Sequence, residues 1–221
     1  RDARTALAVY PAGNANDQFR SWAPGETSLV ELAGMGAPTP VDILELSYHS
    51  ARTGESGRRY ALSHLAVGLL ATAASILNGR RHDALTNILI VPLTLRRFRP
   101  VTVVIETEEV TVDSLSLHIV APMARYLRVS SNAVRDDGLM EAVVVPHRKG
   151  LTWLRILWLA GRAVHGLGAQ GQRASMSFHW EDGGVVQLDG EPIEIPAGSD
   201  VVVSCIPQAI GLVCCRLVPR P

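Results

Sequence analysis

The sequence predicts an α+β fold that is mostly β, with a β-sandwich-like domain and inserted helices. The main observation is a series of short runs in which apolar and polar residues alternate with a period of two, as in half-buried strands. The second is that only two or three longer apolar segments interrupt these runs. Many short strands with few helices are typical of packed sheets. With 221 residues, 47% of them apolar, the chain is long enough to bury a large core.

The first expected element is a short buried strand over residues 5–9, stopped by Pro11 and Gly13. The polar residues 14–17 then predict a cap before a short helix over 18–22. A strand, a glycine turn and a helix start together direct backbone N–H groups at an anion. An ordinary strand-to-helix connection explains the same pattern.

A linker is expected over residues 34–40, because two prolines and two glycines there disfavour both helix and sheet. After it, the expected elements are a strand over 41–48, a loop over 50–59, and helices over 60–77 and 83–97. The first of these helices is rich in Ala and Leu, and we expect it to be mostly buried. Pro92 predicts a break or kink in the second.

From residue 101 the pattern becomes that of strands. Residues 101–105 and 110–112 predict a hairpin. Further strands are expected over 115–121, 140–145, 175–180, 185–188, 200–206 and 211–218. Residues 150–164 predict an amphipathic helix, whose Trp-bearing face we interpret as core, with contact to a lipid chain as the alternative. His165 in its last turn is typical of helix capping.

Composition excludes several classes of protein. The formal net charge is zero, so no global field attracts nucleic acid. The three cysteines, Cys205, Cys214 and Cys215, lack metal-ligand spacing, which argues against a disulfide framework or a zinc site and predicts buried thiols in a reducing cytoplasm. No apolar run approaches the roughly 20 residues that span a bilayer. The chain begins without a methionine, and we expect it to be part of a longer protein.

Two acidic turns end strand-like runs, Asp136-Asp137-Gly138-Leu139 and Leu188-Asp189-Gly190-Glu191. Either one alone is an ordinary turn, because Asp-Gly is the commonest short hairpin signal. Each also places carboxylates at the rim of a sheet, where they meet a metal, a substrate hydroxyl or only water. Their order and spacing, together with the turn after residue 9, distinguish them from chance turns.

These stretches together resemble the bacterial diacylglycerol kinase family of soluble lipid kinases. The matching residues are the turn from Pro11 to Asp17, the two acidic turns and the His165-Gly166 pair, and the resemblance runs from about Leu7 to about Val213. It implies an ATP-binding domain followed by a sandwich, with the active site in the cleft between them. The implied division is 1–38 as the end of the N-terminal α/β ATP-binding domain, 39–207 as the sandwich domain and 208–221 as a strand returning to the first domain.

The resemblance implies transfer of the γ-phosphate of ATP to a lipid hydroxyl. This chemistry needs a cradle for the triphosphate, Mg²⁺, and a carboxylate near the attacking hydroxyl. Glu191 is implied to be the general base and Asp189 its helper. The implied nucleotide-binding residues are Gly13, Asn14, Asn16 and Asp17.

The resemblance also implies a bound Mg²⁺ that is structural rather than catalytic. Its implied ligands are the carboxylate of Asp137 and the backbone carbonyls of Val134 and Leu139, oxygen donors of the kind that Mg²⁺ prefers. Asp136 is the adjacent alternative, and a simple turn is the alternative to both.

Three departures from the family pattern leave activity and substrate preference open. Asn14 stands where the family has Thr, and the segment 121–126 has no glycine where the family is Gly-rich. The family's Gly-Gly-Asp-Gly-Thr loop, which binds the ATP phosphates, is absent from these residues and is expected upstream of Arg1.

The expected function is therefore that of the C-terminal part of an ATP- and Mg²⁺-dependent lipid kinase, inactive in isolation. Its expected partners are ATP and a diacylglycerol-like lipid, at a peripheral position on the cytoplasmic side of a membrane, without nucleic acid and without a membrane span. A homodimer is left open. The first alternative is a non-catalytic lipid-binding module of the same fold, and the second is a relative of NAD kinases.

Overall fold

A computed structural model of the chain describes residues 6–9, 39–72, 94, 98–105, 107–123, 127–128, 130, 133–148 and 171–214. The strands are β1 (Ala6–Val9), β2 (Thr39–Ser50), β3 (Ser56–Ala61), β4 (His64–Gly68), β5 (Val101–Ile105), β6 (Glu108–His118), β7 (Pro122–Met123), β8 (Leu127–Arg128), β9 (Met140–Pro146), β10 (Gln172–Arg173), β11 (Ser175–Trp180), β12 (Gly184–Leu188), β13 (Glu191–Ile195) and β14 (Ser199–Cys214). The prediction of a mostly β protein is confirmed. In this part of the chain, no helix has both the length and the apolar character needed to cross a bilayer.

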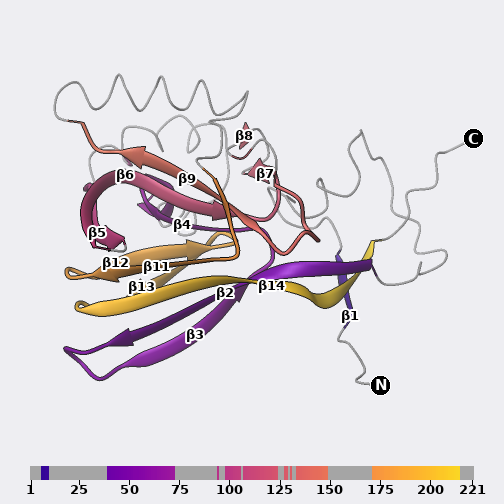
Figure 1. The fold of residues 1–221 in the computed structure, drawn as a ribbon, viewed down its shortest axis with the longest axis horizontal. Coiled ribbons are helices and arrows are strands. Elements are labelled where there is room, and N and C mark those ends of the chain that lie inside the picture. The colour runs from indigo at the N-terminus through magenta and orange to yellow at the C-terminus, as the bar shows by residue number, and fades with distance from the viewer. Residues whose placement is uncertain are drawn as a thin grey trace, which may run out of the picture.

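Twelve strands join in one sheet, whose main path runs β13-β12-β4-β6-β5-β11-β14-β2-β3. Strand β9 pairs with β6, and β10 pairs with β9, while β7 and β8 form a separate pair. All these pairs are antiparallel except that of β1 with β14, which is parallel. The sheet curls, so that β6 and β9 arch over the layer formed by β14, β2 and β3 (Figure 1). One sheet thus supplies both layers of a sandwich-like body.

A single core lies within this curled sheet. Strand β2 shows how the sequence builds it, since Leu44, Leu46 and Tyr48 alternate with more exposed residues and point into the core. The fully buried apolar side chains that join them from other strands include Leu65, Val67, Val112, Leu115, Leu117, Val186, Val201 and Val203, each at 0% exposure. Because both ends of the sheet contribute to one apolar cluster, burial of this cluster stabilises the curl.

The predicted helix over residues 60–77 is wrong in its first half. Residues 60–61 belong to β3 and residues 64–68 form β4, and helical structure is described only over 69–72. Strand β4 lies between β12 and β6, and all five of its residues are buried. A strand buried on both faces lacks the period-two pattern, and its apolar run therefore cannot be distinguished from a buried helix by periodicity.

Other boundaries also differ from the sequence prediction. The expected loop over 50–59 contains most of β3, whose exposed Arg58 and Arg59 suit an edge strand. Residues 115–118 continue β6 past an irregularity between Val112 and Ser114 instead of forming a strand of their own. The expected strands over 200–206 and 211–218 are one strand, β14, within the described residues.

Several predicted elements lie outside the described residues. They are the helices over 18–22 and 150–164, most of the helix over 83–97, the linker residues 34–38 and His165. Thr39 and Pro40 of the expected linker already belong to β2. The hairpin of β5 and β6 and the strands β1, β2, β9, β11 and β12 were predicted at or near their observed positions.

Candidate active site

The turn between β12 and β13 carries the two residues expected to be catalytic. Asp189 and Gly190 both have positive φ, at 50° and 99°, and Leu188 is paired with Glu191 across the turn. Two central residues with positive φ are typical of the type I′ hairpin turn, which suits Asp-Gly. The sequence therefore folds here as a tight hairpin with Glu191 as the first residue of β13.

The carboxylate of Asp189 is bound to the corner between β3 and β4. Its Oδ1 accepts hydrogen bonds from the backbone N–H groups of Ser63 (2.8 Å) and His64 (3.1 Å). Its Oδ2 accepts one from the N–H of Leu62 (2.5 Å), and its own N–H donates to the carbonyl of His64 (3.1 Å). Asp189 therefore fixes the β12–β13 turn to a segment more than 120 residues earlier in the chain.

Glu191, like Asp189, has an exposed side chain, and the two carboxylates differ in their hydrogen-bond partners. Within the part of the chain that the structure describes, no hydrogen bond or ion pair holds its carboxylate. Since both Asp189 oxygens accept backbone N–H groups, Glu191 is the carboxylate of this turn with oxygens open to a reacting group. The geometry thus gives two adjacent carboxylates different surroundings.

Behind this turn lies a row of buried polar side chains that crosses three neighbouring strands. His64 of β4 is opposite His118 of β6, and His118 is opposite Glu141 of β9, so all three point to the same face of the sheet. Gln187, Ser116 and Ser130 are hydrogen-bonded to members of this row. All six are at most 4% exposed. The opposite face of these strands belongs to the apolar core.

Hydrogen bonds and ring stacking of the two histidines connect the members of this row. The Nε2 atom of His64 lies 2.9 Å from Nε2 of Gln187, and the rings of His64 and His118 are stacked with centroids 5.6 Å apart. His118 Nε2 lies 2.9 Å from Ser116 Oγ. Burial lowers the pKa of His118 well below its ordinary value of 6.5, and the neighbouring His64 lowers it further. His118 is therefore neutral in the folded protein near neutral pH.

We expect His118 to make the folded state sensitive to acid. The unfolded chain binds a proton at this residue near pH 6.5, whereas the folded chain does so only at a lower pH, so the free energy of unfolding falls as the pH drops below about 6.5. The slope for one such group is at most about 1.4 kcal/mol per pH unit. Chemical denaturation between pH 7 and 5 measures it. His118→Leu should remove one group's share of the slope, and an unchanged slope in this variant would contradict the role of His118.

The second acidic turn, residues 135–138, leads into β9. Asp137 is exposed, and its Oδ1 accepts the N–H of Leu139 at 2.9 Å, which closes a small turn. Gly138 has φ of 73°, a conformation that favours glycine. Its N–H donates to Asp42 Oδ2 at 2.7 Å. Val134 is 46% exposed.

The oxygens at this turn fit a hard cation. Asp137 Oδ2 and the carbonyls of Val134 and Leu139 accept no hydrogen bond from any residue that the structure describes. All three are oxygen donors, and the exposed turn leaves room for the waters that Mg²⁺ retains. No group of three His, Cys, Asp or Glu side chains that would hold a metal is found in the described part of the chain. A cation here would therefore depend on backbone carbonyls and water.

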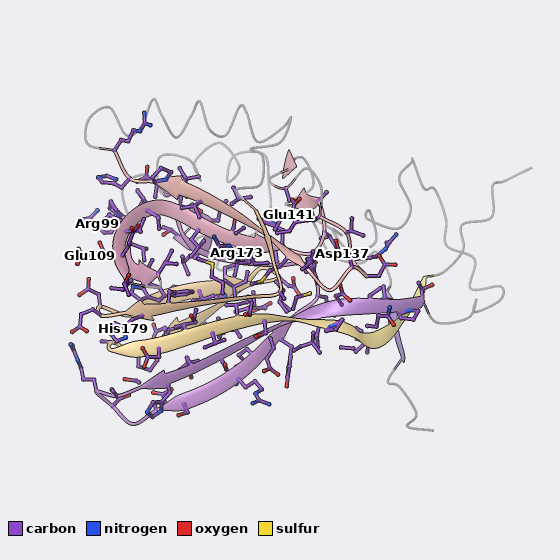
Figure 2. All side chains as sticks on the ribbon, in the orientation of Figure 1. Arg99, Glu109, Asp137, Glu141, Arg173 and His179 are labelled. Carbon is purple, nitrogen blue, oxygen red and sulfur yellow. The ribbon has the colours of Figure 1, made fainter. Side chains whose placement is uncertain are left out.

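The two turns lie at the same end of the sheet but are not adjacent. Asp189 contacts the start of β4, His64 is opposite His118, and His118 is opposite Glu141, which follows the Asp137 turn directly. Figure 2 shows Asp137 and Glu141 toward the same side of the molecule. Three strand spacings of about 4.8 Å separate Asp189 from Glu141 along the sheet, roughly 14 Å in all. A cation held at Asp137 would act on local structure and not directly on Glu191.

The expected nucleotide residues Gly13, Asn14, Asn16 and Asp17 lie outside the described residues. Strand β1, which precedes them, pairs with the end of β14 from Ala6 opposite Gly211 to Val9 opposite Cys214.

The folded chain matches solved structures of diacylglycerol kinases over nearly its whole length. A diacylglycerol kinase from Bacillus anthracis str. Sterne aligns with a TM-score of 0.60 and 15% identity, over 99% of this chain and 71% of that chain. Two further structures, of proteins from the same organism tentatively assigned as diacylglycerol kinases, align with TM-scores of 0.59 and 16% identity. They cover 96% and 99% of this chain and 69% and 72% of their own.

The chain has the fold of these diacylglycerol kinases. The resemblance noted in the sequence is thus confirmed for the fold. No protein-family model matches the sequence, and no curated protein matches it. At this level of identity the diacylglycerol kinase fold fixes the arrangement of strands, and the chemistry has to be argued from the residues.

Sequence reasoning missed Asp42, which is 1% exposed on β2 of this diacylglycerol kinase fold. Its two carboxylate oxygens accept the N–H groups of Gly138 and Gln208, both at 2.7 Å. In the sequence, residue 42 is one polar position in a strand, and no local signal relates it to either partner.

Cys205 lies beside Asp42, and burial together with Asp42 and Asp137 raises the pKa of the Cys205 thiol to about 12. Cys205 is thus a neutral buried thiol, as expected.

Proposed function

We propose that this chain is the C-terminal part of a kinase that transfers the γ-phosphate of ATP to the hydroxyl of a diacylglycerol-like lipid. The observation that carries the proposal is the pair of carboxylates at the β12–β13 turn, on a diacylglycerol kinase fold. Both are exposed, but Asp189 is held by three backbone N–H groups, whereas no hydrogen bond from the described residues holds Glu191.

Glu191 is the general base of this proposal. When the lipid hydroxyl attacks the γ-phosphorus, its O–H bond breaks and a carboxylate within hydrogen-bond reach accepts the proton. Glu191 has the required features, an ionisable oxygen at the rim of the sheet and no structural partner within the described residues. ATP supplies the phosphoryl group when bound, and ADP leaves.

Asp189 has a positioning role in this proposal. Because its carboxylate is occupied by the N–H groups of residues 62–64, it holds the tight turn and thereby the first residue of β13. His64 and His118 of the buried row, together with Gln187, support the same corner from behind. A base fixed on strands of a rigid sheet is better oriented than one on a long loop.

Mg²⁺ at the Asp137 turn belongs to the proposal as a structural cation. Asp137, Val134 and Leu139 would hold it through one carboxylate oxygen and two backbone carbonyls. Gly13, Asn14, Asn16 and Asp17, which follow β1 in the sequence, remain the proposed nucleotide-binding residues. Association with the cytoplasmic surface of a membrane is proposed on the same basis as the lipid substrate.

The direct test is transfer of labelled phosphate from ATP to mixed lipid vesicles by the full-length protein in the presence of Mg²⁺. We expect label in a phosphorylated lipid and none without Mg²⁺. Vesicle binding without transfer would favour the non-catalytic lipid-binding module instead. Label in a nicotinamide dinucleotide added to the same reaction would favour a relative of NAD kinases.

A further inference from the structure

Asp42 joins two segments that are distant in sequence. Through Oδ2 it accepts the N–H of Gly138, in the proposed cation turn, and through Oδ1 it accepts the N–H of Gln208, in β14. Its own N–H donates to the carbonyl of Arg135, at the start of the same turn, also at 2.7 Å. The residue is 1% exposed, so these bonds are shielded from water.

The partner in β14 lies at an irregular point of that strand. The pairing of β14 with β2 shifts register between Ile206 and Ile210, and Gln208 has φ of 48°. Left-handed backbone at a residue other than glycine persists only where surrounding contacts hold it. The bond to Asp42 is such a contact, because it holds the N–H of the residue that adopts this conformation.

The β14 irregularity lies between the part of the strand that pairs with β11 and the part that pairs with β1. Before it, Ser199–Ile206 pairs with β2 and, over part of its length, with β11. After it, Ile210–Leu212 pairs again with β2, and Gly211–Cys214 pairs with β1, the strand that precedes the proposed nucleotide-binding residues. The geometry at Gln208 therefore sets the direction in which β14 reaches β1.

A carboxylate suits this junction better than a neutral side chain. Asp42 forms no ion pair with any side chain in the described residues, so the N–H groups of Gly138 and Gln208 supply the hydrogen bonds that a buried carboxylate needs. An amide at the same position has one acceptor oxygen, and one of the two N–H groups would face an N–H donor instead.

We propose that Asp42 is a positioning residue that fixes the cation turn and the β14 irregularity to each other, so that cation binding at Asp137 is coupled to the β1–β14 pairing. This inference rests on the proposed cation site. Its basis is the pair of 2.7 Å bonds from one buried carboxylate to both segments. A cation that draws in the oxygens of the 134–139 turn would move Gly138, and Asp42 would transmit that movement to Gln208.

The first test is Mg²⁺ affinity of the full-length protein, measured by calorimetry. Loss of a residue that orients a metal's ligands typically weakens binding roughly 10- to 100-fold, and we expect this range for Asp42→Asn. Asp113→Asn is the matched control, because Asp113 is equally buried and bonds to His147 instead of the cation turn. It should leave the affinity within about twofold of the wild type. Asp137→Asn should abolish binding.

The second measurement needs no variant and applies even if Asp42→Asn does not fold. Mg²⁺ added to the isotope-labelled wild type should shift the amide resonances of both Gly138 and Gln208. A shift at Gly138 without one at Gln208, or wild-type affinity in Asp42→Asn with binding lost in Asp137→Asn, would overturn the role of Asp42 and leave the cation site standing. No Mg²⁺ binding by the wild type would overturn both.

Discussion

Glu191→Gln in the full-length protein is expected to lower kcat for phosphate transfer by roughly 10²- to 10⁴-fold, the usual contribution of a general base. The amide keeps the size and hydrogen-bonding capacity of the side chain but cannot accept the proton of the lipid hydroxyl. Because Glu191 is exposed, the free energy of unfolding should change by less than about 0.5 kcal/mol. Initial rates with ATP and lipid vesicles, together with denaturant titration, measure both quantities.

Glu194→Gln is the control for this experiment. Glu194 is also an exposed glutamate on β13, three residues beyond Glu191, so it matches the charge change and the strand. Its kcat should be that of the wild type. Equal losses in the two variants would indicate an effect of net charge at the membrane surface, and full activity in Glu191→Gln would remove Glu191 from the mechanism.

Asp189→Ala is expected to lower the free energy of unfolding by about 3 kcal/mol, because hydrogen bonds to a charged group and buried donors left without acceptors are each worth about 1–3 kcal/mol. The substitution removes the acceptor of three backbone N–H groups, two of which belong to the buried residues Ser63 and His64. For a protein of this size the melting temperature should fall by roughly 6–12 °C. Thermal unfolding followed by circular dichroism measures it.

Asp189→Asn tests the loss of hydrogen bonds without the strain that alanine would have at this positive φ. Asparagine tolerates the positive φ of 50° at this position and keeps one acceptor oxygen, so its effect should lie between those of the wild type and alanine. Asp182→Ala, at an exposed carboxylate before β12, should have little effect. If Asp189→Ala were as stable as the wild type, Asp189 would not hold the turn, and its proposed positioning role would fail.

The sequence predicted those strands that have one buried face. Residues 41–48 and 175–180 alternate, and both lie in strands whose side chains point alternately into the core and outward. It failed at β4, where all five residues are buried and the alternation disappears. It also divided β14 in two, at residues 207–210, where the structure has an irregularity within one strand and Pro207 has no N–H to donate.

In the candidate site, the sequence predicted the local turn but not the contacts between residues that are distant in sequence. The Asp-Gly turn at 189–190 was found because it is a local signal, and the structure confirms a tight hairpin there. The N–H groups that bind the carboxylates of Asp189 and Asp42 lie 96 to 166 residues away in sequence, and no local pattern relates them. The row of His64, His118 and Glu141 depends on strand register, which the sequence alone did not specify.

The most direct test of this account is a crystal structure of the full-length protein with a non-hydrolysable ATP analogue, Mg²⁺ and a short-chain diacylglycerol. The account predicts the lipid hydroxyl within about 2.6–3.2 Å of the Glu191 carboxylate, the reach of a general base, with Asp189 still bound to residues 62–64. A lipid hydroxyl placed beside another carboxylate, with Glu191 directed into solvent, would contradict it.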